Sequence, residues 1–146
     1  MMMSESVLAC SCLADTHGLL QVAMQTSGNL KTSLLEQISS GVIGIPAMVW
    51  QEFKDLYPNE ASELEPYVSA TATIGMRKRA YTAKAGSIAE KLNSGFAVGP
   101  YDSGIEIQVA AIASVEKCPV LTSATELFQY KRMACGAVDL ENWLKK

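Results

Sequence analysis

Four acidic residues carry the strongest chemical signal in the sequence: Asp15, Glu52, Asp102 and Glu106. Each either follows a short apolar run or lies in the first turns of an expected helix. In a chain that alternates strands and helices, the carboxyl ends of parallel strands converge on one crevice. Carboxylates gathered there supply the oxygen ligands that Mg²⁺ and Mn²⁺ prefer. The pattern therefore predicts a divalent-metal site formed by these residues at one edge of a parallel sheet.

Each acidic residue taken alone also has a structural explanation. Asp15 directly follows an apolar run and can cap the helix that comes next. Glu52 shares a stripe with apolar neighbours, where an unpaired buried charge is costly, but it can also point outward into solvent. Asp102 and Glu106 are four residues apart at the start of an expected helix, where negative charge complements the helix dipole. Their joint placement at one predicted edge favours the metal site.

The elements that must position these residues follow from hydrophobic patterning and capping signals. Short apolar runs without helix breakers predict buried strands at 7–14, 42–45, 118–121 and 137–140. Helices are expected at 19–24, from a cap at Asn29 to 41, from Pro46 at its first position to 58, and at 103–116, 123–133 and 141–146. The helix from Ser123 is expected to open with a capping box that pairs Ser123 with Glu126. The segment 59–99 is expected to be helical with interruptions at Pro66, Gly75, Gly86 and Gly95.

This order of elements predicts an α/β protein, in which a central parallel sheet of about four strands lies between two layers of helices. The 146 residues are expected to form a single domain spanning 1–146, close to the commonest domain size. The chain is 49% hydrophobic and only 18% charged. So low a charged fraction suggests apolar surface that is covered by a partner or by a second copy, so we expect a homodimer.

Charge and cysteine usage exclude several classes of protein. The net charge of −3 argues against an overall electrostatic attraction to nucleic acid, although one basic run remains as a local phosphate-binding candidate or a solvated helix face. That run contains Arg77, Lys78, Arg79, Lys84 and Lys91. The four cysteines do not resemble a disulfide framework. No apolar run approaches the ~18 residues of a membrane span, and the first residues carry no basic charge, so we expect a cytoplasmic protein without a membrane partner.

The sequence resembles the PIN domain family over nearly the whole chain, and three stretches carry the resemblance. Leu13-Ala14-Asp15-Thr16-His17 is similar to the family's opening strand, which ends in Asp followed by Ser or Thr. Ile45-Pro46 through Glu52 is similar to its segment of strand, proline and Glu-bearing helix. The stretch from Glu106 to Thr122 is similar to its Ala-rich helix, which begins with an acidic residue and leads into a strand ending in Thr. Counting back from Thr122 places the family's Asp on Glu106, with Asp102 as an assisting or replacing acid.

The resemblance implies a metal-dependent ribonuclease, because the family includes the VapC-type toxins of bacterial toxin–antitoxin pairs. It implies that Asp15, Glu52 and Glu106, with Asp102, hold Mg²⁺ or Mn²⁺ and carry catalysis. RNA is the implied substrate and an antitoxin protein the implied partner. The implied substrate-binding residues are Thr16, His17, Arg77, Lys78, Arg79, Thr122 and Ser123.

Two departures from the family pattern leave a second interpretation open. The family usually has another Asp two residues after the strand-ending Thr, and this sequence has Ala124 there. His17 stands where a small amide is usual. The alternative function is therefore a catalytically impaired PIN-like protein that acts as a partner-binding or regulatory module. A small-molecule-binding α/β protein is less well supported, because no Gly-rich phosphate loop follows a strand.

Overall fold

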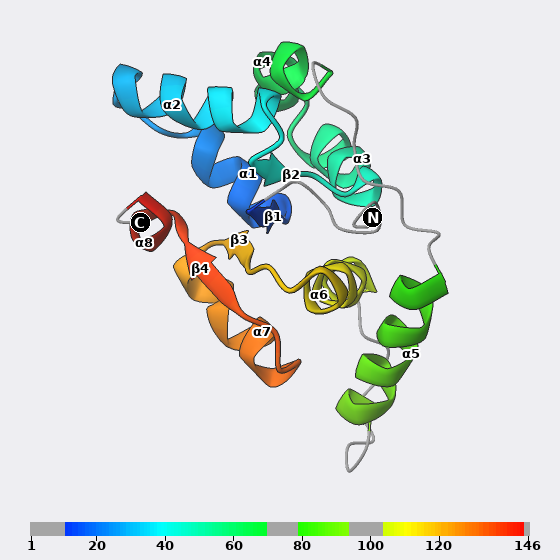
Figure 1. Cartoon of the computed structure of the whole chain (residues 1–146). Helices are drawn as coiled ribbons and strands as arrows, with labels where there is room; N and C mark the ends of the chain where they lie inside the picture. Colours follow the sequence, from blue (N-terminus) through cyan, green and yellow to red (C-terminus); the bar gives the residue numbers. More distant parts are fainter. Residues whose placement is uncertain (1–10, 70–78, 94–103, 145–146) are drawn as a thin grey trace, which may run out of the picture.

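The computed structural model describes residues 11–69, 79–93 and 104–144 (Figure 1). Within these ranges the strands form one four-stranded sheet in the order β2-β1-β3-β4, and every neighbouring pair is parallel. The strands are β1 Cys12–Ala14, β2 Ile43–Gly44, β3 Val120–Thr122 and β4 Ala137–Asp139. The α/β class and the parallel sheet of about four strands are thus confirmed.

Burial explains the composition of the strands. All residues of β1 and β3 are buried, as expected for central strands covered on both faces, whereas β4 at the edge is only half-buried. Leu13 pairs with Gly44 on one side and Val120 on the other, so β1 lies in the middle of the sheet. Residues 7–10 of the expected first strand lie outside the described ranges.

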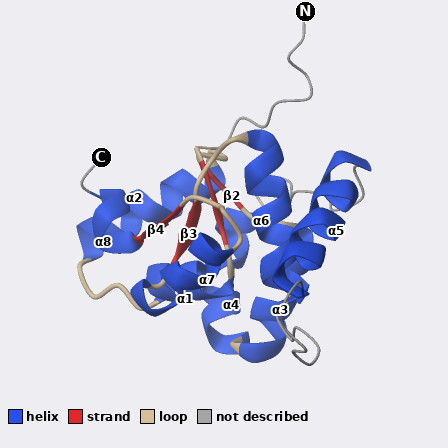
Figure 2. Cartoon of the chain, turned by 90° about the horizontal axis from the view of Figure 1, so that it is seen from below, coloured by secondary structure: helices blue, strands red, loops and turns tan. Residues whose placement is uncertain are grey.

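Helices pack on both sides of the sheet (Figures 1 and 2). In Figure 1, α1–α4 lie above the strands and α6 and α7 below them, with α5 packed outside α6. The helices are α1 Thr16–Ala23, α2 Gly28–Ser39, α3 Ala47–Leu56, α4 Pro58–Val68, α5 Arg79–Asn93, α6 Gly104–Glu116, α7 Leu127–Arg132 and α8 Leu140–Leu144, with a 3₁₀ turn, η2, at Ala124–Glu126. In the described part of the chain, none of these helices has the length and hydropathy needed to cross a membrane.

Several predicted helix starts were wrong, and for α1 and α2 the reason is that a different polar group caps the helix. Helix α1 begins at Thr16, since the Asp15 side chain already accepts a hydrogen bond from Gly18 N. The hydroxyl of Ser27, not Asn29, caps α2 by accepting from Leu30 N at 3.4 Å. Pro46 is the residue before α3 and not its first helical residue.

The interruptions expected at Pro66 and Gly86 were also wrong, because both residues lie inside helices. Pro66 falls near the end of α4, which is held by the buried side chains of Ala61, Leu64 and Val68. Tertiary packing therefore outweighs the missing backbone donor of the proline. Gly75 and Gly95 lie outside the described residues.

Candidate active site

The candidate site lies where β1 and β3 end side by side. From β1 the chain crosses to β2 on one side of the sheet and later returns to β3 on the other, so the β1–β3 boundary is a topological switch point. Asp15 follows β1, and its backbone N–H donates to Leu121 O in β3 at 3.2 Å. Asp15 and Thr122 are therefore neighbours although they are distant in sequence, because both lie at the carboxyl ends of neighbouring parallel strands.

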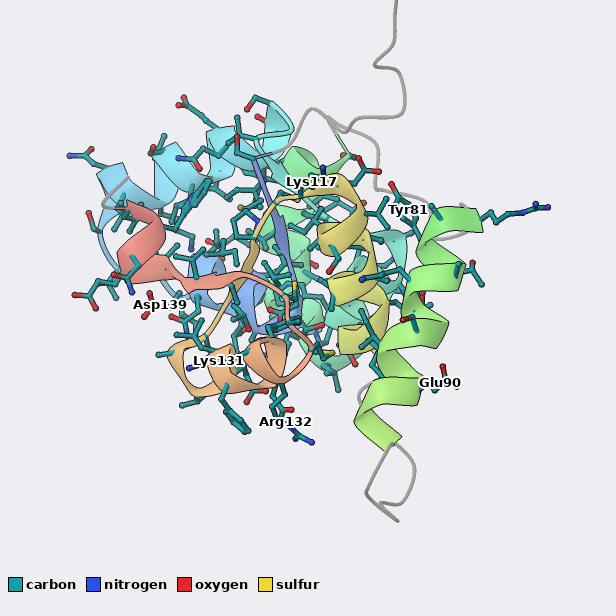
Figure 3. All side chains as sticks on the ribbon, turned by 60° about the horizontal axis from the view of Figure 1, so that its bottom comes forward. Tyr81, Glu90, Lys117, Lys131, Arg132 and Asp139 are labelled. Atoms are coloured by element: carbon teal, nitrogen blue, oxygen red, sulfur yellow. The ribbon has the colours of Figure 1, made fainter. Side chains whose placement is uncertain are left out.

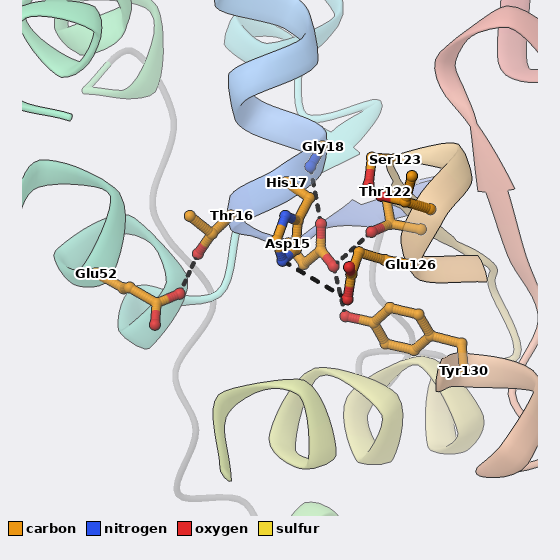
Figure 4. Close-up of polar contacts among 10 residues, drawn as sticks. Asp15, Thr16, His17, Gly18, Glu52, Thr122, Ser123, Glu126 and Tyr130 are labelled. Carbon is orange, nitrogen blue, oxygen red and sulfur yellow. Dashed lines mark hydrogen bonds and ion pairs between the residues drawn. The ribbon is translucent and has the colours of Figure 1, made fainter. Parts of the chain in front are cut away.

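The Asp15 carboxylate accepts three hydrogen bonds (Figure 4). Its Oδ1 accepts from Gly18 N at 2.8 Å. Its Oδ2 accepts from the hydroxyl of Thr122 at 2.7 Å and from the hydroxyl of Tyr130 at 2.6 Å. The residue is only 1% exposed, so water contributes little to its solvation.

Burial dominates the electrostatics of Asp15. Removal from water raises the pKa of this carboxyl above its ordinary value of 3.8, although the hydrogen bonds from Tyr130, Gly18 and Thr122 and the nearby His17 lower it in part. Its three hydrogen-bond donors are two hydroxyls and one amide, none of which carries a charge. An ionised carboxylate in this setting is stabilised by a nearby cation, or else takes up a proton.

A close contact between α1 and β3 makes this arrangement possible. A Cβ atom added at Gly18 would lie 2.1 Å from Leu121 O and 2.8 Å from its carbonyl carbon. Only glycine therefore lets the first turn of α1 approach the end of β3. This approach places Gly18 N and Thr122 on the same carboxylate.

Glu52 is joined to the site through Thr16. The Thr16 hydroxyl donates to Glu52 Oε1, which ties the first residue of α1 to the middle of α3 (Figure 4). Thr16 is buried and Glu52 is half-buried, so Glu52 does not simply point into solvent. The structure thus links Glu52 to Thr16, the residue that follows Asp15 in the sequence.

The predicted capping box between Ser123 and Glu126 was wrong. Ser123 makes no side-chain cap, and its hydroxyl lies 3.0 Å from the hydroxyl of Thr125. Glu126 instead turns toward α1, where its Oε1 lies 3.9 Å from Nε2 of His17 (Figure 4). The physical reason is the 3₁₀ turn η2, which replaces the first α-helical turn that the motif requires.

The other expected site residues are not all gathered here. Glu106 lies in the first turn of α6, at the end of that helix nearest the carboxyl edge of the sheet, but its side chain falls outside the described part. Asp102, Arg77 and Lys78 lie outside the described residues. Arg79 begins α5 and is exposed.

The position of α5 separates Arg79 from Asp15. Tyr81, in the first turn of α5, donates its hydroxyl to Glu116 Oε2 at the last residue of α6. Figure 3 shows Tyr81 and Lys117 at the same end of the α5–α6 pair and Glu90 toward the other. Because α6 runs opposite to the strands, Arg79 lies toward the amino edge of the sheet, whereas Asp15 lies at the carboxyl edge.

The donor chemistry of the site fits a hard cation. Among the described residues, no group of three or more His, Cys, Asp or Glu side chains is arranged to hold a metal ion. Asp15 and Glu52 nevertheless supply carboxylate oxygens, and Mg²⁺ is commonly bound through one or two carboxylates while it keeps several waters. A cation would stabilise the ionised form of the buried Asp15 carboxyl, which burial disfavours.

Tyr130 is the residue that sequence reasoning missed. It is fully buried in α7, and its hydroxyl bonds to the central acid of the site. The available signal was a tyrosine in the short helix after the strand that ends in Thr122, because a buried tyrosine hydroxyl requires a partner. The sequence alone did not indicate which partner.

Comparison with known proteins supports the fold assignment but does not establish a function. No family model matches the sequence, and no curated protein matches it either. Among solved structures, the chain is similar to a chain of VapBC2 from Rickettsia felis, which was determined bound to a DNA fragment from their promoter. The two chains are 15% identical with a TM-score of 0.62, and the match covers 87% of this chain and 96% of that chain. At this identity the likeness establishes the fold alone, and the fold of this protein is PIN-like.

Proposed function

We propose that the protein is a metal-dependent ribonuclease that hydrolyses RNA phosphodiester bonds. The observation that carries the proposal is the buried Asp15 carboxylate at the β1–β3 switch point, surrounded by uncharged donors. A buried acid whose pKa is raised and which lies at the usual position of α/β active sites is a strong candidate for a functional residue. The second acid, Glu52, supports the same interpretation because Thr16 holds it at the same edge.

The residues of the chain have distinct proposed roles. Asp15 and Glu52 would hold Mg²⁺ or Mn²⁺, together with Glu106 and Asp102. The bound ion would lower the pKa of a water molecule and neutralise charge on the phosphate. Thr16 orients the carboxylate of Glu52, and Thr122 orients the carboxylate of Asp15. His17 and Ser123 lie at the partly exposed rim, where they can contact the RNA backbone.

We further propose that the protein is the toxin of a toxin–antitoxin pair. The similarity to a chain of the VapBC2 structure supports an antitoxin as partner. Exposed apolar side chains on α3 and α7 and directly after α1 provide contact area for such a partner or for a second copy of the chain. They are Met24, Met48, Leu56 and Phe128.

The test is cleavage of a mixed RNA pool with Mn²⁺, with Mg²⁺ and with EDTA. We expect cleavage with either metal, none with EDTA, and a loss greater than about 100-fold in Asp15→Asn, because even groups that only support a metal ligand cost 10–100-fold. Asp55→Asn is the matched control, because Asp55 is an exposed acid on α3 whose carboxylate accepts from Gln51. An Asp15→Asn protein as active as wild type would contradict the proposal.

A second candidate function has its own observation. The Asp15 carboxylate already accepts three hydrogen bonds, and Ala124, where an acid would complete the family pattern, is exposed in η2. These features favour a PIN-like binding module without catalysis. In that case wild type would not cleave RNA, and Ala124→Asp would raise Mn²⁺ affinity by about 10-fold or more by adding a carboxylate ligand.

A further inference from the structure

Tyr130 contacts Asp15 from the interior of the protein, where solvent does not reach. Its side chain is fully buried, and its hydroxyl lies 2.6 Å from Asp15 Oδ2 (Figure 4). Helix α7 holds the residue by its backbone as well, because Tyr130 O accepts from Met133 N at 3.0 Å and from Cys135 N at 2.9 Å. Burial of the side chain and these backbone hydrogen bonds together favour the position in which the hydroxyl contacts Asp15.

The hydrogen bonds give the two oxygens of the Asp15 carboxylate different roles. A carboxylate offers about four lone-pair sites, two on each oxygen. Both sites of Asp15 Oδ2 are used, by the hydroxyls of Thr122 and Tyr130, whereas Oδ1 accepts one bond from Gly18 N. One acceptor site is therefore left, and it belongs to Oδ1.

We propose that Tyr130 is a positioning residue of the metal site: together with Thr122 it occupies Oδ2 of Asp15 and so leaves Oδ1 as the oxygen that binds the cation. This inference rests on the proposed function. Tyr130 does not touch metal or substrate in this scheme. It acts through Asp15 by holding the carboxyl group in one rotation, so that no free energy is spent on orienting the ligand when the cation binds.

The chain offers a matched control for this contact. Tyr81 is also buried, and its hydroxyl also lies 2.6 Å from a carboxylate oxygen, Oε2 of Glu116. That pair joins α5 to α6 away from Asp15. Tyr81→Phe and Tyr130→Phe thus remove the same chemical group from comparable contacts, and each keeps the buried ring.

The experiment measures the Mn²⁺ affinity of the whole protein by titration calorimetry, together with thermal unfolding in the absence of metal. We expect Tyr130→Phe to bind Mn²⁺ about 10–100-fold more weakly than wild type, the range found when a group that orients a metal ligand is lost. Tyr81→Phe is expected to keep wild-type affinity, although both variants lose stability. Cleavage of the RNA pool should fall with Mn²⁺ occupancy in Tyr130→Phe and recover at high Mn²⁺.

The outcomes separate this inference from the function on which it rests. Wild-type affinity in a folded Tyr130→Phe protein would overturn the positioning role but leave the ribonuclease intact. Tighter Mn²⁺ binding would also overturn it, because the hydroxyl would then compete with the cation. Wild type that binds no Mn²⁺ would overturn both. If Tyr130→Phe does not fold, Thr122→Val removes the other donor to Oδ2, and unchanged affinity there would equally contradict the proposal.

Discussion

The two edges of the sheet each bury an acidic group, the carboxyl of Asp15 at one edge and the thiol of Cys135 at the other. The free-energy cost of burying these two groups differs. At the carboxyl edge, burial raises the pKa of Asp15 above 3.8. At the amino edge, burial raises the pKa of Cys135 from 9.0 to about 11, with a hydrogen bond to Ser114 lowering it in part. At neutral pH the Cys135 thiol is uncharged, so its burial takes no charge out of water. An ionised Asp15 carboxylate, by contrast, would be held in a site that disfavours it.

The distribution of buried polarity shows the same contrast. Among the described residues, the buried polar or charged side chains are Asp15, Thr16 and Thr122, and all of them lie at the carboxyl edge. The amino edge has the cysteines Cys118 and Cys135 before β3 and β4. Costly burial of an acidic carboxyl at the carboxyl edge supports the function proposed for that edge.

The largest expected effect on stability comes from breaking the close approach at the carboxyl edge. Gly18→Ala places a Cβ 2.1 Å from Leu121 O, and because this neighbour is backbone, α1 must move away from β3. We expect a loss of about 1–3 kcal/mol in the free energy of unfolding, measured by chemical denaturation, the usual cost of overpacking.

The counterpart at the amino edge is Gly136, where an added Cβ meets nothing within 4 Å. Gly136→Ala should be neutral or should stabilise by up to about 1 kcal/mol, because it restricts the unfolded chain. Equal losses in the two variants would show that the edges are packed alike and would refute the comparison.

The pH dependence of stability sharpens the electrostatic side of the comparison. A carboxyl whose folded pKa is raised binds its proton more tightly in the folded state, so its contribution to stability falls as pH rises from 3.8 toward the folded value. Wild type should therefore lose stability relative to Asp15→Asn across that window, as measured by urea denaturation at a series of pH values. A relative gain with rising pH would mean that a favourable charge partner dominates at Asp15.

The same measurement on Cys135→Ala should give a pH dependence only in the alkaline range. The thiol pKa is 9.0 ordinarily and about 11 in the fold, so wild type should lose stability relative to the variant between those values. Below pH 8 the difference between the two proteins should not change with pH.

The smallest expected effect concerns two serines before helical turns. Ser27→Ala removes the cap that accepts from Leu30 N and should cost about 1 kcal/mol in unfolding free energy. Ser123→Ala, at the carboxyl edge, removes no cap and should cost less than about 0.5 kcal/mol. A larger loss for Ser123→Ala would show that the capping box forms in solution and that Glu126 is drawn away from His17.

Hydrophobic patterning was sufficient to predict the strands and their common edge. The short apolar runs around Leu13 and Leu121 lack breakers, and strands of that kind become buried parallel strands. The rule that parallel strand ends converge then placed Asp15 at the shared carboxyl edge of the sheet, where the structure adds its hydrogen bond from Thr122. The helix starts were less predictable, because Ser27 and Asn29 are chemically equivalent caps and local sequence does not distinguish between them.

The sequence by itself therefore determined the α/β class, the parallel sheet and the position of Asp15 at the carboxyl end of a strand, because these depend on periodicity and on the geometry of parallel strands. Only the tertiary structure decided that Glu52 bonds to Thr16, that Glu126 turns to His17 and that Tyr130 reaches Asp15. Such contacts depend on how α3, η2 and α7 pack against α1. Packing sets side-chain direction through the sum of many weak contacts, which no local pattern encodes.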